Sequence, residues 1–299
     1  MPREDLPIEL KLRDVIARPT IAELSGYASD DASLDPLLLL NSRVSASTPL
    51  FCLHAGFGTV FDYEPLARRL EGRCTVYGLQ CRMLLDHAWV DDSLETMAID
   101  YAQYIRQKQP EGPYQLAGWS LGGTLAVLVA KELESQGQRV AVLALVDSFV
   151  PSARQAVQES DWSADLRGFL AVILGVSADA LVLPVVPVGS TQDALERVIE
   201  TARAAQAAQS AYAEIGNADL AQTFVVAMKL KALSRQLRQL PSTEAAASCW
   251  WAGEGAHACG ISGSCQDIAV DAGHYDILEQ VEVLEGMIAR LLLADTISQ

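Results

Sequence analysis

The feature that most constrains the fold of this chain is the Gly-x-Ser-x-Gly motif at Gly118–Gly122. An apolar run from Tyr114 to Ala117 precedes it, and apolar residues at helical spacing follow it. Strand, sharp turn and helix in this order place a serine on a strained turn at a helix N-terminus. The two glycines of the motif remove side chains that would collide there. The pattern favours a nucleophilic Ser120 over an ordinary N-capping serine in a glycine-rich turn.

Strand-like and helix-like segments alternate on both sides of this motif, which predicts a mostly parallel sheet with helices on both faces. The expected strands are Pro49–His54, Cys74–Gln80, Tyr114–Ala117, Val140–Val146, Ala247–Ala252 and Asp267–Val270. An amphipathic segment from Asp276 to Leu293 is expected to close the chain as a helix.

The alternation breaks at about residues 151–240, where the sequence is helix-like throughout, and strands resume afterwards. A sheet that is interrupted and then resumed indicates a helical insertion, which we expect to act as a lid over the strand ends. An independent helical domain is the alternative. Residues 1–28 do not resemble the start of the alternating pattern, and residues 29–35 form a linker rich in Asp, Ser and Ala. The sheet domain is therefore expected to span residues 36–299.

Composition limits the partners that this chain can have. The formal net charge of −16 argues against nucleic acid and anionic lipid. No apolar run approaches the ~20 residues that span a membrane, and residues 1–5 do not begin a secretory signal.

The six cysteines lie mostly in or beside apolar runs, as expected for reduced thiols in the cytoplasm. His257 and Cys259 lie near Cys265, but the spacing matches no common zinc pattern, so neither a metal nor a bound cofactor is expected.

A serine nucleophile needs a base, and the base needs a carboxylate that fixes its tautomer. In the fold where this turn is best known, the chain order is serine, acid, histidine, with the histidine after the last strand. Among the four histidines, His274 fits this order, whereas His54 and His87 precede the serine and His257 lies one strand too early.

Two carboxylates are candidates for the acid. Asp147 directly follows the strand Val140–Val146, at the edge where open α/β sheets place their reactive groups. Glu254 follows the next strand and is the alternative. Asp147 is favoured.

Acyl transfer also needs two backbone N–H donors that form an oxyanion hole. Leu121, the residue after the serine, is expected to supply one donor. The turn that starts at His54 is expected to supply the other, from Ala55 or Gly56.

Four segments together resemble the type I thioesterase domain that ends nonribosomal peptide synthetases. They are Phe51–Gly56, Gly118–Gly123, Leu145–Ser148 and Gly273–Leu278. The resemblance spans roughly residues 36–293 and implies an α/β-hydrolase fold with a helical lid. It supports Asp147 as the acid. Many relatives have proline after the histidine of the first segment, where this chain has Ala55, so the second oxyanion donor stays open.

Residues 1–28 resemble the last helices of a peptidyl carrier domain, which makes that domain the expected partner. The resemblance implies that Ser120 takes a peptidyl chain from the phosphopantetheine thioester on the carrier. Release by water and release by macrocyclisation are equally open. The alternatives are a stand-alone serine carboxylesterase or lipase and a non-catalytic module that docks a carrier domain.

Overall fold

The computed structural model describes residues 35–41, 47–148, 161–205, 215–253 and 264–298. These residues form two compact units. Of the described residues, the larger unit comprises 36–41, 47–148, 223–253 and 264–298, and the smaller comprises 35, 161–205 and 215–222. Each unit is described below by itself.

The larger unit is built on a seven-stranded sheet with the strand order β1-β3-β2-β4-β5-β6-β7. The strands are β1 (Leu37–Leu39), β2 (Leu50–Leu53), β3 (Val76–Leu79), β4 (Tyr114–Trp119), β5 (Val140–Val146), β6 (Ala247–Ala252) and β7 (Cys265–Val270). Only β1, at one edge, runs antiparallel to its neighbour among these strands. The predicted mostly parallel sheet is therefore confirmed.

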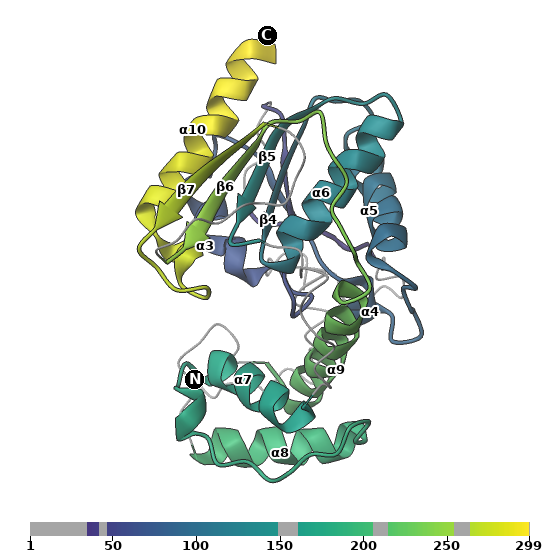
Figure 1. Ribbon diagram of the computed structural model, residues 1–299, viewed down its shortest axis with the longest axis vertical. Helices are drawn as coiled ribbons and strands as arrows, with labels where there is room; N and C mark the ends of the chain where they lie inside the picture. Colours follow the sequence, from purple (N-terminus) through teal and green to yellow (C-terminus); the bar gives the residue numbers. More distant parts are fainter. Residues whose placement is uncertain (1–34, 42–46, 149–160, 206–214, 254–263, 299) are drawn as a thin grey trace, which may run out of the picture. The chain divides into compact units, whose positions relative to one another are not determined.

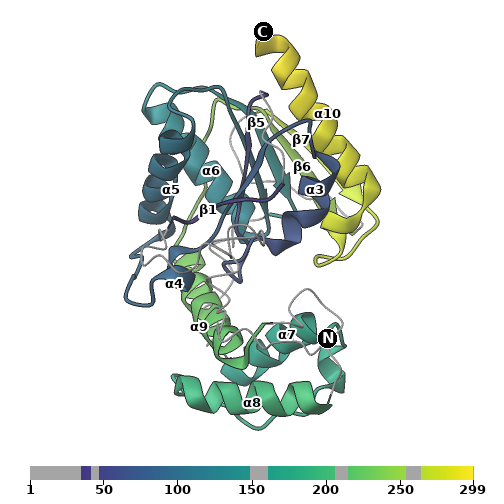
Figure 2. The ribbon, with the colours of Figure 1, turned by 180° about the vertical axis from the view of Figure 1, so that it is seen from behind.

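Helices cover both faces of this sheet (Figure 1). They are α3 (Glu64–Arg69), α4 (Arg82–Leu85), α5 (Leu94–Lys108), α6 (Leu121–Ser135) and α10 (Val281–Ser298). The long helices α5 and α6 lie on one face, and α10 with α3 lies on the other, as the view from behind also shows (Figure 2). Ser93 begins α5 with a capping box, in which its hydroxyl accepts from the N–H of Thr96.

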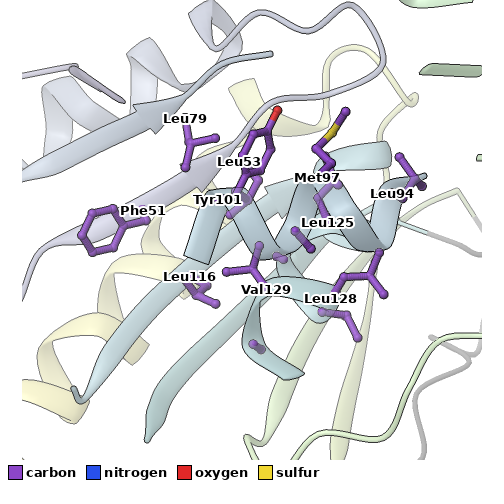
Figure 3. Close-up of a cluster of buried hydrophobic side chains, with 14 of the residues drawn as sticks. Phe51, Leu53, Leu79, Leu94, Met97, Tyr101, Leu116, Leu125, Leu128 and Val129 are labelled. Carbon is purple, nitrogen blue, oxygen red and sulfur yellow. The ribbon is translucent and has the colours of Figure 1, made fainter. Parts of the chain in front are cut away.

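The largest part of the core lies between the sheet and the α5–α6 layer (Figure 3). Phe51 and Leu116 of the strands belong to the same cluster of buried side chains as Met97, Tyr101 and Leu125 of the helices. Buried residues alternate less strictly in these strands than in an amphipathic sheet, because both faces are covered.

The smaller unit is helical in its described part, as the sequence predicted. It contains α7 (Trp162–Leu174), a 3₁₀ turn (Ala178–Ala180), α8 (Gln192–Ala205) and the start of α9 (Asn217–Ser234). Asp161 begins α7 by accepting from the N–H groups of Ser163 and Ala164, and Gly175 ends it in the left-handed conformation. The lid role of this unit stays a prediction.

Two parts of the predicted domain organisation need separate mention. Residues 1–28, the predicted carrier remnant, lie outside the described residues. Residues 223–234 of α9 belong to the larger unit, where Val226 and Leu230 join the core beside the sheet. Within the ranges given above, none of the helices is both long and apolar enough to cross a lipid bilayer.

The closing helix starts later than the sequence pattern indicated. Residues Ile277–Glu279 form a 3₁₀ turn, Gln280 is extended, and α10 begins only at Val281. Ile277 in the turn and Leu284, Ile288 and Leu291 in α10 are all buried, so the apolar spacing continues across the break and made two elements look like one, although Val281 between them is 57% exposed.

Candidate active site

Ser120 lies on a sharp turn between β4 and α6, with the unusual backbone angles φ 55° and ψ −124°. The glycines around it are required by space. A Cβ at Gly118 would lie 2.1 Å from the carbonyl oxygen of Gly122, and one at Gly122 would lie 2.3 Å from that of Leu53. The turn therefore has the geometry that the motif predicted.

His274 lies in the loop after β7, four residues beyond the end of the strand. Its Nε2 is 3.1 Å from the hydroxyl oxygen of Ser120, although the two residues are 154 positions apart in the chain. The contact exists because β4 and β7 run parallel in one sheet, so the loops after both strands meet at the same edge.

Asp147 directly follows β5 and contacts the other ring nitrogen. Its Oδ2 is 2.5 Å from Nδ1 of His274. Its Oδ1 accepts from the N–H of Ala252 at 3.1 Å, and its own N–H donates to Trp250 O at 2.7 Å. Asp147 has a positive φ of 45°, a conformation that these contacts with β6 hold in place.

These contacts determine which ring nitrogen of His274 carries the proton. An ionised carboxylate only accepts hydrogen bonds, so Nδ1 of His274 carries the proton that points to Asp147. Nε2 then presents a lone pair to the Ser120 hydroxyl and can take its proton. The side chains of His274 and Asp147 are 31% and 15% exposed, so the relay is shielded from water while its outer end stays accessible.

The expected oxyanion donors lie beside Ser120. Gly122, at the start of α6, approaches the carbonyl groups of Leu53 and His54 so closely that a Cβ could not fit. The turn after β2 is thus adjacent to the N-terminus of α6. Within the described ranges, the backbone N–H groups of Leu121, Ala55 and Gly56 donate to no other backbone group. Their role as oxyanion donors stays a prediction.

His54 has a structural environment that the sequence did not reveal. It is fully buried, with Nδ1 2.8 Å from Ala55 O and Nε2 2.8 Å from the Tyr101 hydroxyl. A carbonyl only accepts, so Nδ1 donates and Nε2 accepts from Tyr101. Burial lowers the pKa of His54 to about 4, so the ring is neutral at working pH. It braces the turn that carries Ala55 and Gly56.

Two aromatic residues beside the serine were also missed. Trp119 donates from Nε1 to the backbone oxygen of His274 at 3.0 Å. The Tyr63 hydroxyl donates to Leu53 O and accepts from the N–H of Trp119, both at 2.7 Å. No local pattern could have identified these contacts, because each joins residues far apart in the sequence.

The alternative acid Glu254, and the loop residues His257 and Cys259, lie outside the described residues. In the described part of the chain, a separate group of possible metal ligands lies on β6 and β7. The ligand atoms of Cys249, Cys265 and Asp267 lie within 4.8 Å of one another, and the two sulfurs are 3.0 Å apart. This group shares no residue with the Ser120–His274 relay.

A mostly parallel sheet that carries a serine on a strand–turn–helix elbow, with a histidine after its last strand, defines an α/β-hydrolase of the serine type. The family model of the thioesterase domain matches residues 48–291. The chain therefore belongs to the thioesterase domain family.

Individual relatives point in the same direction. Malpibaldin synthetase of Mortierella alpina is 40% identical over 151 residues, which cover 49% of this chain and 3% of the synthetase. A crystal structure of the four-domain nonribosomal peptide synthetase holo-AB3403 matches 96% of this chain with 22% of its own length, at a TM-score of 0.72 and 18% identity. The surfactin thioesterase domain SrfTE matches 87% of this chain with 96% of its own, at a TM-score of 0.55 and 18% identity.

The two solved structures establish similarity of fold. The chain spans only 2% to 6% of the length of three curated relatives, all of them synthetases. It therefore corresponds to a small part of those large proteins.

Proposed function

We propose that this chain is the terminal thioesterase of a nonribosomal peptide synthetase, which releases a peptidyl chain from a carrier-bound phosphopantetheine thioester. The observation that carries the proposal is the relay of Ser120, His274 and Asp147 in a chain of the thioesterase domain family. The synthetases among its relatives support the peptidyl substrate. The carrier partner rests on the resemblance of residues 1–28 to a carrier tail, and the cytoplasmic location stays a prediction.

The reaction has two steps. His274 Nε2 takes the proton of Ser120 as Oγ attacks the thioester carbonyl, and Asp147 stabilises the imidazolium that forms. Leu121 and the turn residue Ala55 or Gly56 donate to the oxyanion. The C–S bond then breaks, the phosphopantetheine thiol takes the proton from His274, and the peptidyl chain remains as an ester on Ser120.

The second step releases this ester. A nucleophile loses its proton to His274 and attacks the ester, and Ser120 regains a proton as it leaves. Water gives the free acid, whereas a hydroxyl or amine of the peptide itself gives a ring. Ring closure requires water to be excluded while the chain folds back, which is the role proposed for the helical lid.

A pantetheine thioester of a short peptide tests the first step. We expect Ser120→Ala to abolish the acyl-enzyme seen by mass spectrometry and to lower turnover about 10⁴-fold or more. Ser135→Ala is the matched control, because Ser135 lies exposed at the far end of α6. A marked preference for p-nitrophenyl esters over the thioester would instead favour a carboxylesterase. Absence of any Ser120 adduct, also with a fluorophosphonate, would favour a non-catalytic module.

The acid assignment has its own test. We expect Asp147→Ala to lower kcat by about 10³- to 10⁴-fold and Glu254→Ala to change it by less than about 3-fold. The reverse pattern would assign the acid to Glu254.

The mass of the product from the native peptidyl thioester distinguishes the two modes of release, since a ring is lighter than the free acid by one water.

A further inference from the structure

Tyr63 joins the two backbone segments that flank the oxyanion site. It lies in a 3₁₀ turn at Phe61–Tyr63 and is 1% exposed. Its hydroxyl donates to the carbonyl of Leu53, the last residue of β2, and accepts from the N–H of Trp119, the last residue of β4. Both distances are 2.7 Å, so one hydroxyl uses a donor and an acceptor function at full strength.

The position of this bridge in the sheet gives it a specific consequence. Leu53 pairs with Gly118 at the end of the β2–β4 ladder, and both chains turn away immediately afterwards. Leu53 leads into the turn that carries Ala55 and Gly56, while Trp119 leads into Ser120 and Leu121. The hydroxyl therefore fixes the separation of the two chains where each begins to form its half of the oxyanion hole.

From these contacts we propose that Tyr63 is a positioning residue, whose hydroxyl sets the spacing between the N–H donor of Leu121 and the donor in the Ala55–Gly56 turn. The proposal rests on the oxyanion site of the proposed function. Gly122 supports it independently, since it lies against the same Leu53 carbonyl so closely that a Cβ would be 2.3 Å away. Leu53 O is thus the point where β2, the elbow and Tyr63 meet.

Tyrosine is well suited to this position. Burial raises the pKa of Tyr63 well above its ordinary value, so the hydroxyl remains a neutral donor throughout the working pH range. Phenylalanine would fill the same space but would leave a buried carbonyl and a buried N–H without this partner. Those two groups would then be free to shift toward other partners, and the two oxyanion donors would shift with them.

The test compares Tyr63→Phe with Tyr114→Phe. Tyr114 is also fully buried and lies on the same strand, β4, as Trp119, but its hydroxyl donates to Gln109 O near the opposite end of that strand. Each variant loses one tyrosine hydroxyl and its hydrogen bond to a backbone carbonyl, and thermal melting measures the stability that each loss costs. Only Tyr63→Phe is expected to lower kcat, by about 10- to 100-fold with KM nearly unchanged, because displaced donors weaken stabilisation of the transition state.

A boronic acid that forms a tetrahedral adduct on Ser120 provides the decisive readout. Its inhibition constant should rise in Tyr63→Phe by the same factor by which kcat/KM falls, and should stay unchanged in Tyr114→Phe. A p-nitrophenyl ester serves as substrate, because any acyl group uses the oxyanion site. The test therefore remains valid if the thioester substrate proves wrong.

Two outcomes would overturn the proposal: kcat and boronate affinity within about 2-fold of wild type in Tyr63→Phe, or equal losses in both variants. If Tyr63→Phe fails to fold, p-aminophenylalanine at position 63 replaces it, since its amino group still donates to Leu53 O but accepts poorly from Trp119. Its kcat is then expected to fall with unchanged KM, and a wild-type kcat would reject the role of the hydroxyl.

Discussion

Trp119, the variable residue before the serine in the Gly-x-Ser-x-Gly motif, contacts the loop that carries His274. Its indole N–H donates to the backbone oxygen of His274, and the two rings lie 5.2 Å apart between centroids with a tilt of 34°. Tyr275 meets the indole edge-on at 6.1 Å. The residue next to the nucleophile therefore holds the base from both its backbone and its ring.

Trp119→Phe is expected to lower kcat/KM about 2- to 10-fold, because one hydrogen bond that orients His274 is lost. The control is Trp89→Phe, which removes an indole N–H bonded to Asp91 in a loop outside the relay. Steady-state kinetics on both variants measure the effect. If Trp89→Phe lowers kcat/KM equally, the loss in Trp119→Phe is due to general destabilisation and not to the contact with His274.

His54 makes the stability of the fold depend on pH. Its pKa is about 4 in the folded chain and near 6.5 when the chain is unfolded, so between these values the unfolded state binds more protons. The contribution of His54 to the free energy of unfolding is therefore fully present above pH ~6.5 and is lost as the pH falls toward 4. Burial raises the pKa of Asp62 to about 6, which acts in the opposite direction over part of the same range.

Comparison with a variant isolates the contribution of His54. His54→Asn removes the titrating group, while its amide can still donate to Ala55 O. The gap in the free energy of unfolding between wild type and variant should narrow by up to about 3 kcal/mol from pH 7 to pH 4. Urea unfolding at several pH values measures it. A gap that stays constant with pH would contradict the neutral, buried imidazole.

At the scale of elements, two helical glycines differ in whether the fold has room for a side chain at their position. Gly122→Ala places a Cβ 2.3 Å from a backbone carbonyl, so we expect loss of folding or of all activity. Gly168→Ala in α7 meets nothing within 4 Å and should stabilise the fold by about 0.5–1 kcal/mol. Thermal melting of both variants tests the pair. A stable, active Gly122→Ala enzyme would show that the turn can relax.

Elements with a local signal were predictable from the sequence. The bounds of β5 and β6 agree with the expected runs. The edge strand β1 has only three leucines and depends on antiparallel pairing with β3, a contact that no local pattern encodes. The later start of α10 was missed because the apolar stripe runs through the 3₁₀ turn before it.

The site was predictable to the extent that chain order constrains it. The motif around Ser120, and the position of His274 after the last strand, follow from the order of elements. Asp147 was favoured over Glu254 from its place after β5, and its contact with Nδ1 of His274, a property of the folded chain, supports that choice. The roles of Tyr63, Trp119 and His54 arise from packing between distant segments.

At the scale of the whole molecule, the 38 acidic and 22 basic residues give a net charge of −16. The resulting field should slow the approach of anionic substrates at low ionic strength. We expect a lysine-bearing peptidyl thioester to have a higher kcat/KM than its aspartate-bearing counterpart. The ratio should approach one as salt rises from about 0.01 to 0.5 M, because screening shortens the field. A ratio insensitive to salt would indicate local contacts instead.

The strands β2 and β4 to β7 all run in one direction, so Ser120, Asp147 and His274 lie beyond their carboxyl ends, and the opposite edge of the sheet carries none of the three. Gly137 lies at that opposite edge, between α6 and β5. It is exposed and has a positive φ of 75°, and a Cβ added there would meet nothing within 4 Å. Foreign sequence such as a reporter or a surface-attachment loop can therefore be spliced in there. An enzyme attached to a surface through this point would keep the sheet edge that carries Ser120 on the side away from the surface.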